Sequence, residues 1–107
     1  MTTNPRPEIE SRPRDAVDLA PLYHLILLDD DDHSYEYVVE MLGRIFGYAV
    51  EKAFALACAV DGTGQAIVET ASRERVDGHQ RAIHDFGADP RIPRCRGSMS
   101  AIIEAAS

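Results

Sequence analysis

Four consecutive carboxylates, Asp29 to Asp32, followed by His33, form the densest group of chemically active side chains in the sequence. They come directly after the apolar run at residues 25–28. Like charges repel one another at short range, and an opposite charge stabilises each of them. The cluster therefore predicts a site for a cationic group.

Two simple interpretations of these acids stay open. In the first, Asp32 caps the helix that follows and the other carboxylates are solvated near its positive end. In the second, the clustered oxygens bind Mg²⁺ or Ca²⁺, which prefer such ligands. The run lacks the D-x-[DN]-x-[DN]-G spacing of a calcium loop, so the motif itself does not select a metal.

The elements that position the cluster follow from hydrophobic spacing and from Gly, Pro and Ser punctuation. Residues 1–20 contain three prolines and no apolar period, which predicts a flexible arm before a domain at 21–107. Strands are expected at 23–28, 65–71 and 94–99. Helices are expected from a cap at 32–34 to about 46, from 50 to 61, and from 72 to about 86. The order β-α-α-β-α-β indicates an α+β domain.

The apolar side chains predict which face of each helix is buried. The first helix carries an apolar stripe of Tyr35, Val38, Val39, Leu42, Ile45 and Phe46, of which the last four are expected in the core. The second is expected to bury Val50, Ala53, Phe54, Ala57 and Val60, and the third Val76 and Ile83. The two cysteines, Cys58 and Cys95, are expected to be reduced core thiols, with Cys58 serving packing.

Composition narrows the function classes. The net charge is −7, and residues 29–61 carry eight acids against two basic residues, which would repel nucleic acid. No apolar run approaches the roughly 20 residues that span a membrane, and no signal peptide is visible, so we expect a cytoplasmic protein. No Ser/His/Asp or Cys/His set has coherent spacing, so we expect neither catalysis nor a cofactor.

The segment YHLILLDDDDHSYEYVV at residues 23–39 resembles the ClpS family, the bacterial N-degron adaptors. Their hallmark is an apolar strand, then Asn-Asp-Asp, a Thr or His two residues on, and a Met-Glu-Phe-Val helix start. The resemblance weakens after Gly87, where Pro93 and Cys95 are similar to the family's Pro-Leu-x-Cys end. It implies a three-stranded antiparallel sheet with three helices. It also implies an adaptor that binds the free α-amino group and first side chain of a protein and delivers that protein to a Clp-type AAA+ unfoldase. We expect a monomer, because no surplus apolar stripe requires a partner.

The resemblance implies roles for particular residues. The residues that match the family's α-amino-binding positions are Asp29, Asp30, Asp31 and Asp61. Those matching the side-chain pocket are His33, Tyr35, Val38, Ala57 and Val60, with a last pocket residue near Ile92 or Pro93. Glu74 and His79 match positions that dock the unfoldase.

Three departures from the family pattern concern specificity. Asp29 stands where the family has Asn, and Asp61 stands where it has His. Ala57 is smaller than the family's Met, which favours a deeper slot. A deep slot with additional acids could accept an N-terminal Arg or Lys in place of a bulky apolar residue. Two alternatives remain: an acidic interaction module with the same fold but no N-terminal recognition, and a Mg²⁺- or Ca²⁺-binding regulator at the Asp run.

Overall fold

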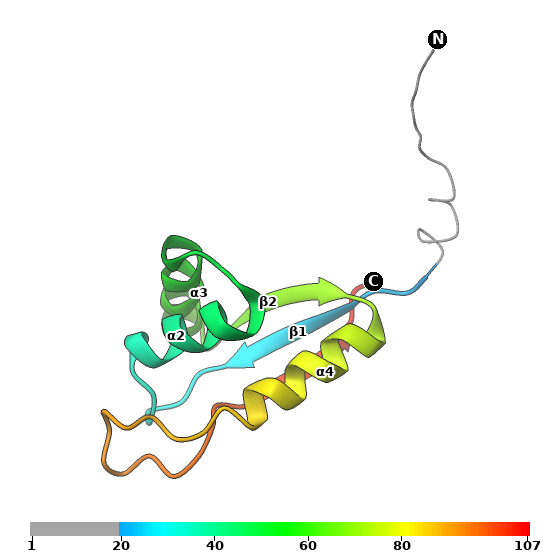
Figure 1. Ribbon diagram of the computed structural model, residues 1–107. Helices are drawn as coiled ribbons and strands as arrows, with labels where there is room; N and C mark the ends of the chain where they lie inside the picture. The colour runs from blue at the N-terminus through cyan, green and yellow to red at the C-terminus, as the bar shows by residue number, and fades with distance from the viewer. Residues whose placement is uncertain (1–19) are drawn as a thin grey trace.

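The computed structural model describes residues 20–107, and the arm expected at 1–20 lies outside this range except for Ala20 (Figure 1). The elements are β1 (Tyr23–Leu28), α2 (Tyr35–Phe46), α3 (Val50–Thr63), β2 (Gln65–Ala71), α4 (Arg73–His84) and β3 (Ala101–Ala105). Their order is the predicted β-α-α-β-α-β, so the expected α+β class is confirmed.

Strand β1 is the centre of the sheet, whose order is β2-β1-β3 with both pairs antiparallel. Leu25, Ile26 and Leu27 are 0%, 3% and 0% exposed, so β1 is buried on both faces. A strand covered on both faces reads as a continuous apolar run in place of an alternating one. The position of β1 therefore explains the apolar run that leads into the acids.

The expected third strand at 94–99 is wrong, because β3 begins at Ala101. Residues 87–97 instead form a loop under the start of α2, drawn in orange below it in Figure 1. Pro90 and Pro93 lack the N–H groups that a ladder requires. The apolar residues at 101–103 pair with β1 in their place, with Ile103 opposite Leu25.

Helix α2 begins where Ser34 caps it, since the Ser34 side chain accepts a hydrogen bond from the Tyr37 N–H at 3.1 Å. The buried face is turned relative to the expected stripe. Tyr37 and Met41, which lie outside the expected stripe, are 1% and 0% exposed, whereas Tyr35, the first residue of that stripe, is 36% exposed. The reason is that α2 contacts both α3 and α4, so its buried face is wider than a single seam.

Helix α3 buries Ala53, Ala57 and Val60, as expected, but not the larger residues beside them. Val50 is 66% exposed and Phe54 49% exposed, so their predicted burial is wrong. The buried positions follow one row of the helix at steps of four and three, and Phe54 lies about 100° round the axis from Ala53. The neighbour of Ala57, Cys58, is exposed for the same reason and does not serve packing.

Helix α4 lies across the sheet and contacts all three strands (Figure 1). Its cap is Ser72, which accepts a bond from the Arg75 N–H at 3.3 Å, and it buries Val76 and Ile83 as predicted. Within residues 20–107, no helix has both the length and the apolar character to cross a membrane.

Candidate functional site

The end of β1 is bonded directly to the end of α3. The Asp29 N–H donates to the Gly64 carbonyl at 2.9 Å, and the preceding Leu28 N–H donates to the Ser100 carbonyl at 3.0 Å. Gly64 ends α3 in a left-handed conformation with φ of 91°, which a residue with a Cβ rarely adopts. Asp61 lies in the last turn of α3, so the Asp run and Asp61 belong to one acidic corner.

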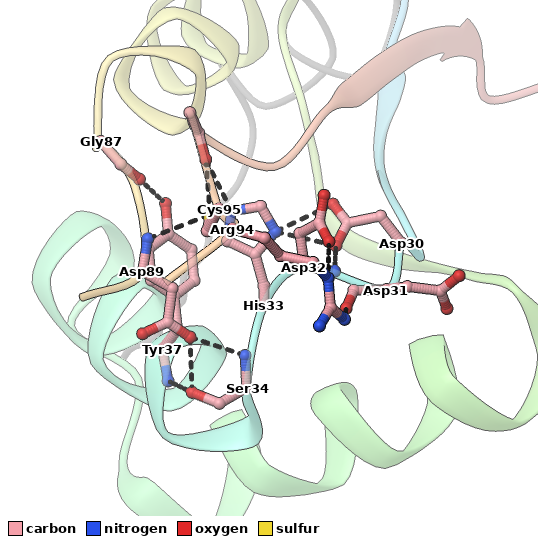
Figure 2. Close-up of polar contacts among 11 residues, drawn as sticks. Asp30, Asp31, Asp32, His33, Ser34, Tyr37, Gly87, Asp89, Arg94 and Cys95 are labelled. Atoms are coloured by element: carbon pink, nitrogen blue, oxygen red, sulfur yellow. Dashed lines mark hydrogen bonds and ion pairs between the residues drawn. The ribbon is translucent and has the colours of Figure 1, made fainter. Parts of the chain in front are cut away.

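The acids of this corner differ in what holds them (Figure 2). Asp30 accepts the Asp32 N–H at 2.8 Å and faces His33 Nδ1 at 2.8 Å. Asp32 forms an exposed ion pair with Arg94 at 2.8 Å, and Arg94 Nη2 also donates to the Asp31 carbonyl at 2.6 Å. Asp29 and Asp31 are exposed to solvent. The Asp run is therefore a turn held by hydrogen bonds to its backbone and by the contacts of Asp30 and Asp32. The carboxylates of Asp29 and Asp31 are left facing solvent.

His33 is part of the scaffold of the corner, although it matched a pocket-rim position. Its side chain is only 4% exposed. Its Nδ1 faces Asp30, and its Nε2 lies 2.7 Å from the Gly97 carbonyl and 3.3 Å from Cys95 Sγ. Both ring nitrogens thus meet acceptors, and the ring also packs on Tyr37 at 4.5 Å between centroids. The ring locks the Asp run to the loop at 87–97.

Asp89 is the second anchor of this loop, and it was not predicted. It is 1% exposed, and its Oδ2 accepts bonds from both the N–H and the hydroxyl of Ser34 at 2.7 Å. Its Oδ1 accepts from the Arg91 N–H at 3.0 Å and from Arg91 Nη1 at 3.2 Å. Burial alone would raise the pKa of Asp89, but the bonds from Ser34 and Arg91 outweigh it and hold the pKa well below its ordinary value.

No local pattern reveals these anchors, because their partners are distant in sequence. Asp89 bonds a residue 55 positions earlier, and Cys95 lies 62 positions after His33. The Cys/His contact was missed for this reason. The thiol is itself satisfied, since it accepts the Asp89 N–H at 3.2 Å and donates to the Gly97 carbonyl at 3.3 Å.

The residues matched to the pocket wall lie under the surface. Val38, Ala57 and Val60 are 5%, 3% and 2% exposed and belong to the core between α2 and α3. Ile92 and Pro93, near which the last pocket residue was expected, lie in the loop at 87–97. Met99, which is 3% exposed, lies just before β3.

Tyr35 contacts exposed residues of α3 next to this buried row. Its hydroxyl donates to Asp61 Oδ2 at 2.6 Å, and its ring lies 5.5 Å from that of Phe54. The hydrogen bond to Asp61, followed by burial and the charge of Asp61, raises the pKa of Tyr35 to about 12. Two residues matched to separate roles are therefore bonded to each other across α2 and α3.

A groove of about 380 Å³ opens beside Tyr35. It is lined by Tyr35, Glu36, Val39, Glu40 and Phe54. Glu40 is paired with Arg44 at 3.0 Å. The groove is thus formed mainly by residues of α2, with Phe54 of α3 on its remaining side.

The two residues matched to unfoldase docking lie on α4. Glu74 is in the first turn and exposed. His79 is 24% exposed, and its Nδ1 lies 2.7 Å from Glu69 Oε1. The other Glu69 oxygen pairs with Arg75 at 2.9 Å, so His79 also serves a local network.

The structure offers no ligand set for a metal among residues 20–107: no three His, Cys, Asp or Glu side chains there converge suitably. The two cysteines are both free thiols.

Comparison with known proteins identifies a family and relatives that this chain resembles. The family described as "ATP-dependent Clp protease adaptor protein ClpS" matches residues 18–91. ClpS of Escherichia coli O1:K1 is 30% identical over 84 residues, covering 78% of this chain and 79% of that protein. ClpS of Salmonella arizonae is 29% identical over 85 residues, covering 79% and 80%.

A solved structure shares the fold. Agrobacterium tumefaciens ClpS2, bound to L-phenylalaninamide, superposes with a TM-score of 0.68 and 21% identity, covering 79% of this chain and 96% of that one. Together, the matched residues and the fold define a small α+β domain of the Clp-adaptor class. The chain belongs to the ClpS family.

Proposed function

We propose that this protein binds the free α-amino group and first side chain of N-degron proteins and delivers them to a Clp-type AAA+ unfoldase. The observation that carries the proposal is the acidic corner, where the Asp29–Gly64 bond joins the Asp run to the helix end that holds Asp61. The related Agrobacterium ClpS2 was solved with L-phenylalaninamide, which has a free α-amino group and an aromatic side chain.

The chemistry of the corner suits an α-ammonium group. Such a group has three N–H donors and one positive charge, so it requires several close acceptors. Hydrogen bonds between charged groups contribute roughly 1.5–3 kcal/mol each. Asp29, Asp30, Asp31 and Asp61 provide these acceptors in our proposal. Asp30 is already fixed by His33, which holds its carboxylate in place before a ligand arrives.

The first side chain would enter between α2 and α3, against Val38, Ala57 and Val60. These walls are apolar, which favours a bulky apolar residue. The acids that replace neutral family residues at 29 and 61 make an N-terminal Arg or Lys the second class to test.

Delivery would use the exposed side of α4 that carries Glu74, with His79 as a secondary contact because it is bonded to Glu69. This role requires neither catalysis nor a cofactor, and it implies a cytoplasmic monomer. The metal-regulator alternative has no supporting ligand set in residues 20–107.

The test is fluorescence anisotropy with labelled peptides that differ only in residue 1: Phe, Leu, Tyr, Trp, Arg, Lys and Ala, each free and N-acetylated. We expect binding of a bulky or basic class that is lost on acetylation. Asp30→Asn should weaken binding about tenfold, in line with the loss of one charged hydrogen bond. Asp85→Asn removes the same charge from an exposed site at the end of α4 and should leave binding unchanged. Binding that ignores acetylation would contradict the proposal and favour an interaction module.

A further inference from the structure

The loop at 87–97 is a basic segment beside the Asp run. It contains three arginines and one acid, whereas the run itself contains four acids. Arg91 is engaged within the loop and on α2, because it bonds both Asp89 and Glu40. Arg94 is the loop arginine that bonds the Asp run, so groups of opposite charge lie side by side at this corner.

The Arg94 guanidinium is held along one of its edges (Figure 2). Its Nε donates to Asp32 Oδ1 at 2.8 Å, and its Nη2 donates to the Asp31 carbonyl at 2.6 Å. A guanidinium has five N–H groups, so both N–H groups of Nη1 and one of Nη2 remain. Within residues 20–107 these three donors bond no other protein atom, and the side chain is 68% exposed. Nη1 and Nη2 form the second edge, which suits a carboxylate that accepts two parallel hydrogen bonds.

The loop has other anchors besides Arg94. Asp89 accepts two bonds from Ser34 at 2.7 Å, and His33 Nε2 lies 2.7 Å from the Gly97 carbonyl. An exposed ion pair of the kind that Arg94 forms contributes little to stability by itself. The position of Arg94 therefore has little structural value, and its second edge is available to a ligand at the corner.

We propose that Arg94 is a specificity-determining residue that binds an acidic side chain at the second position of the N-degron. This inference rests on the proposed function, in which Asp30 is one of the acceptors of the α-ammonium group. Arg94 bonds the carbonyl of Asp31, the residue after Asp30, and neighbouring Cα atoms are about 3.8 Å apart. The second residue of a bound peptide has the same separation from the first, which brings a carboxylate on its side chain within reach of the guanidinium.

The charges around Arg94 decide the sign of this preference. Asp29 and Asp31 are exposed, and both repel a carboxylate on the second residue. Arg94 opposes this repulsion through direct, charge-assisted hydrogen bonds. Exposed ion pairs change an equilibrium by about 1.5- to 5-fold, and ideal bidentate geometry favours the upper part of that range. Without Arg94 the two exposed acids remain, so the preference should reverse.

The experiment is fluorescence anisotropy with peptides that begin with Phe or Arg and carry either Asp or Asn at residue 2, each free and N-acetylated. Asp and Asn have nearly the same shape, so the ratio of the two Kd values reports charge, and general damage to the corner cancels. Wild type should bind the free Asp peptide about 2- to 5-fold more tightly than the Asn peptide. Arg94→Gln should reverse that order. Arg73→Gln is the matched control, since it removes a 59% exposed arginine, paired with Asp77, at the start of α4, and it should keep the wild-type ratio.

A second measurement repeats the wild-type titrations at higher salt. Because salt screens exposed charges, raising NaCl from about 0.02 M to about 0.5 M should bring the ratio of the two Kd values toward one. If free peptides bind and acetylated ones do not, but wild type and Arg94→Gln give the same ratio, the role of Arg94 is refuted while the proposed function stands. A wild type that prefers the Asn peptide refutes that role as well. If no free peptide of either series binds, the proposed function fails and the role of Arg94 fails with it.

Discussion

Replacement of Asp89 tests the claim that a buried carboxylate holds the acidic corner in place. Asp89→Ala would leave the Ser34 N–H, the Ser34 hydroxyl and the Arg91 N–H without their acceptor in a partly buried loop. Each unsatisfied buried group costs roughly 1–3 kcal/mol, and water reaching the loop reduces the sum. We expect a loss of about 3 kcal/mol in the free energy of unfolding. For a domain of this size that corresponds to a fall in Tm of about 12–24 °C.

The pH dependence of the free energy of unfolding tests the same claim more specifically. The folded-state pKa of Asp89 lies below its unfolded value of about 3.8, so its contribution is fully present above about pH 4 and is lost as the pH falls below that value. Asp89→Asn keeps the shape but can accept with only one oxygen, and should cost about 1–2 kcal/mol at pH 7. The gap between wild type and Asp89→Asn should narrow between pH 4 and pH 2.

The assay is urea unfolding followed by circular dichroism at pH 7, 4, 3 and 2, with Asp85→Asn as the exposed control. The control should stay within about 0.5 kcal/mol of wild type. A gap for Asp89→Asn that is constant across these pH values would refute the argument. So would wild-type stability for Asp89→Ala at pH 7.

Three further changes have defined outcomes. Gly64→Ala, at φ of 91°, should lower the free energy of unfolding by about 1 kcal/mol in urea unfolding. Gly62→Ala, inside α3, should be neutral or stabilising by up to about 1 kcal/mol. Equal effects of the two changes would contradict the left-handed conformation at the end of the helix. The exposed Cys58 should react with a thiol reagent at least tenfold faster than Cys95, and Cys58→Ser should abolish the fast phase. Met41→Ala, at a fully buried position, should cost about 2–4 kcal/mol by the same urea unfolding assay, and a loss below about 1 kcal/mol would contradict its burial.

The sequence predicts this fold well where local signals are strong. The bounds of β2 are those expected, because Gly64 ends one helix and Ser72 caps the next. The last strand was misplaced at 94–99, because the β-branched residues that pair with β1, Ile102 and Ile103, come later in the chain. Within helices, the steps of three and four locate a buried row only to within one neighbour, which is why Phe54 was placed in the core.

The candidate site, like the fold, could be predicted only where its residues are close together in the sequence. The Asp run is visible in sequence because its members are adjacent. The bond between Tyr35 and Asp61, and the contacts of Asp89 with Ser34 and of Cys95 with His33, join residues 26 to 62 positions apart. Such contacts leave no periodic trace, so only the structure reveals that Tyr35 is bonded to Asp61 and that the loop at 87–97 supports the corner.

The central position of β1 has a consequence for the nascent chain. β1 is the first strand to be synthesised, yet its partner β3 comes more than seventy residues later. Until residues 101–105 have emerged, the most apolar strand of the sheet has one edge without a neighbour. Open, apolar strand edges are sites of intermolecular pairing. We therefore expect ribosome-bound chains that lack β3 to depend on chaperones, although the finished domain does not.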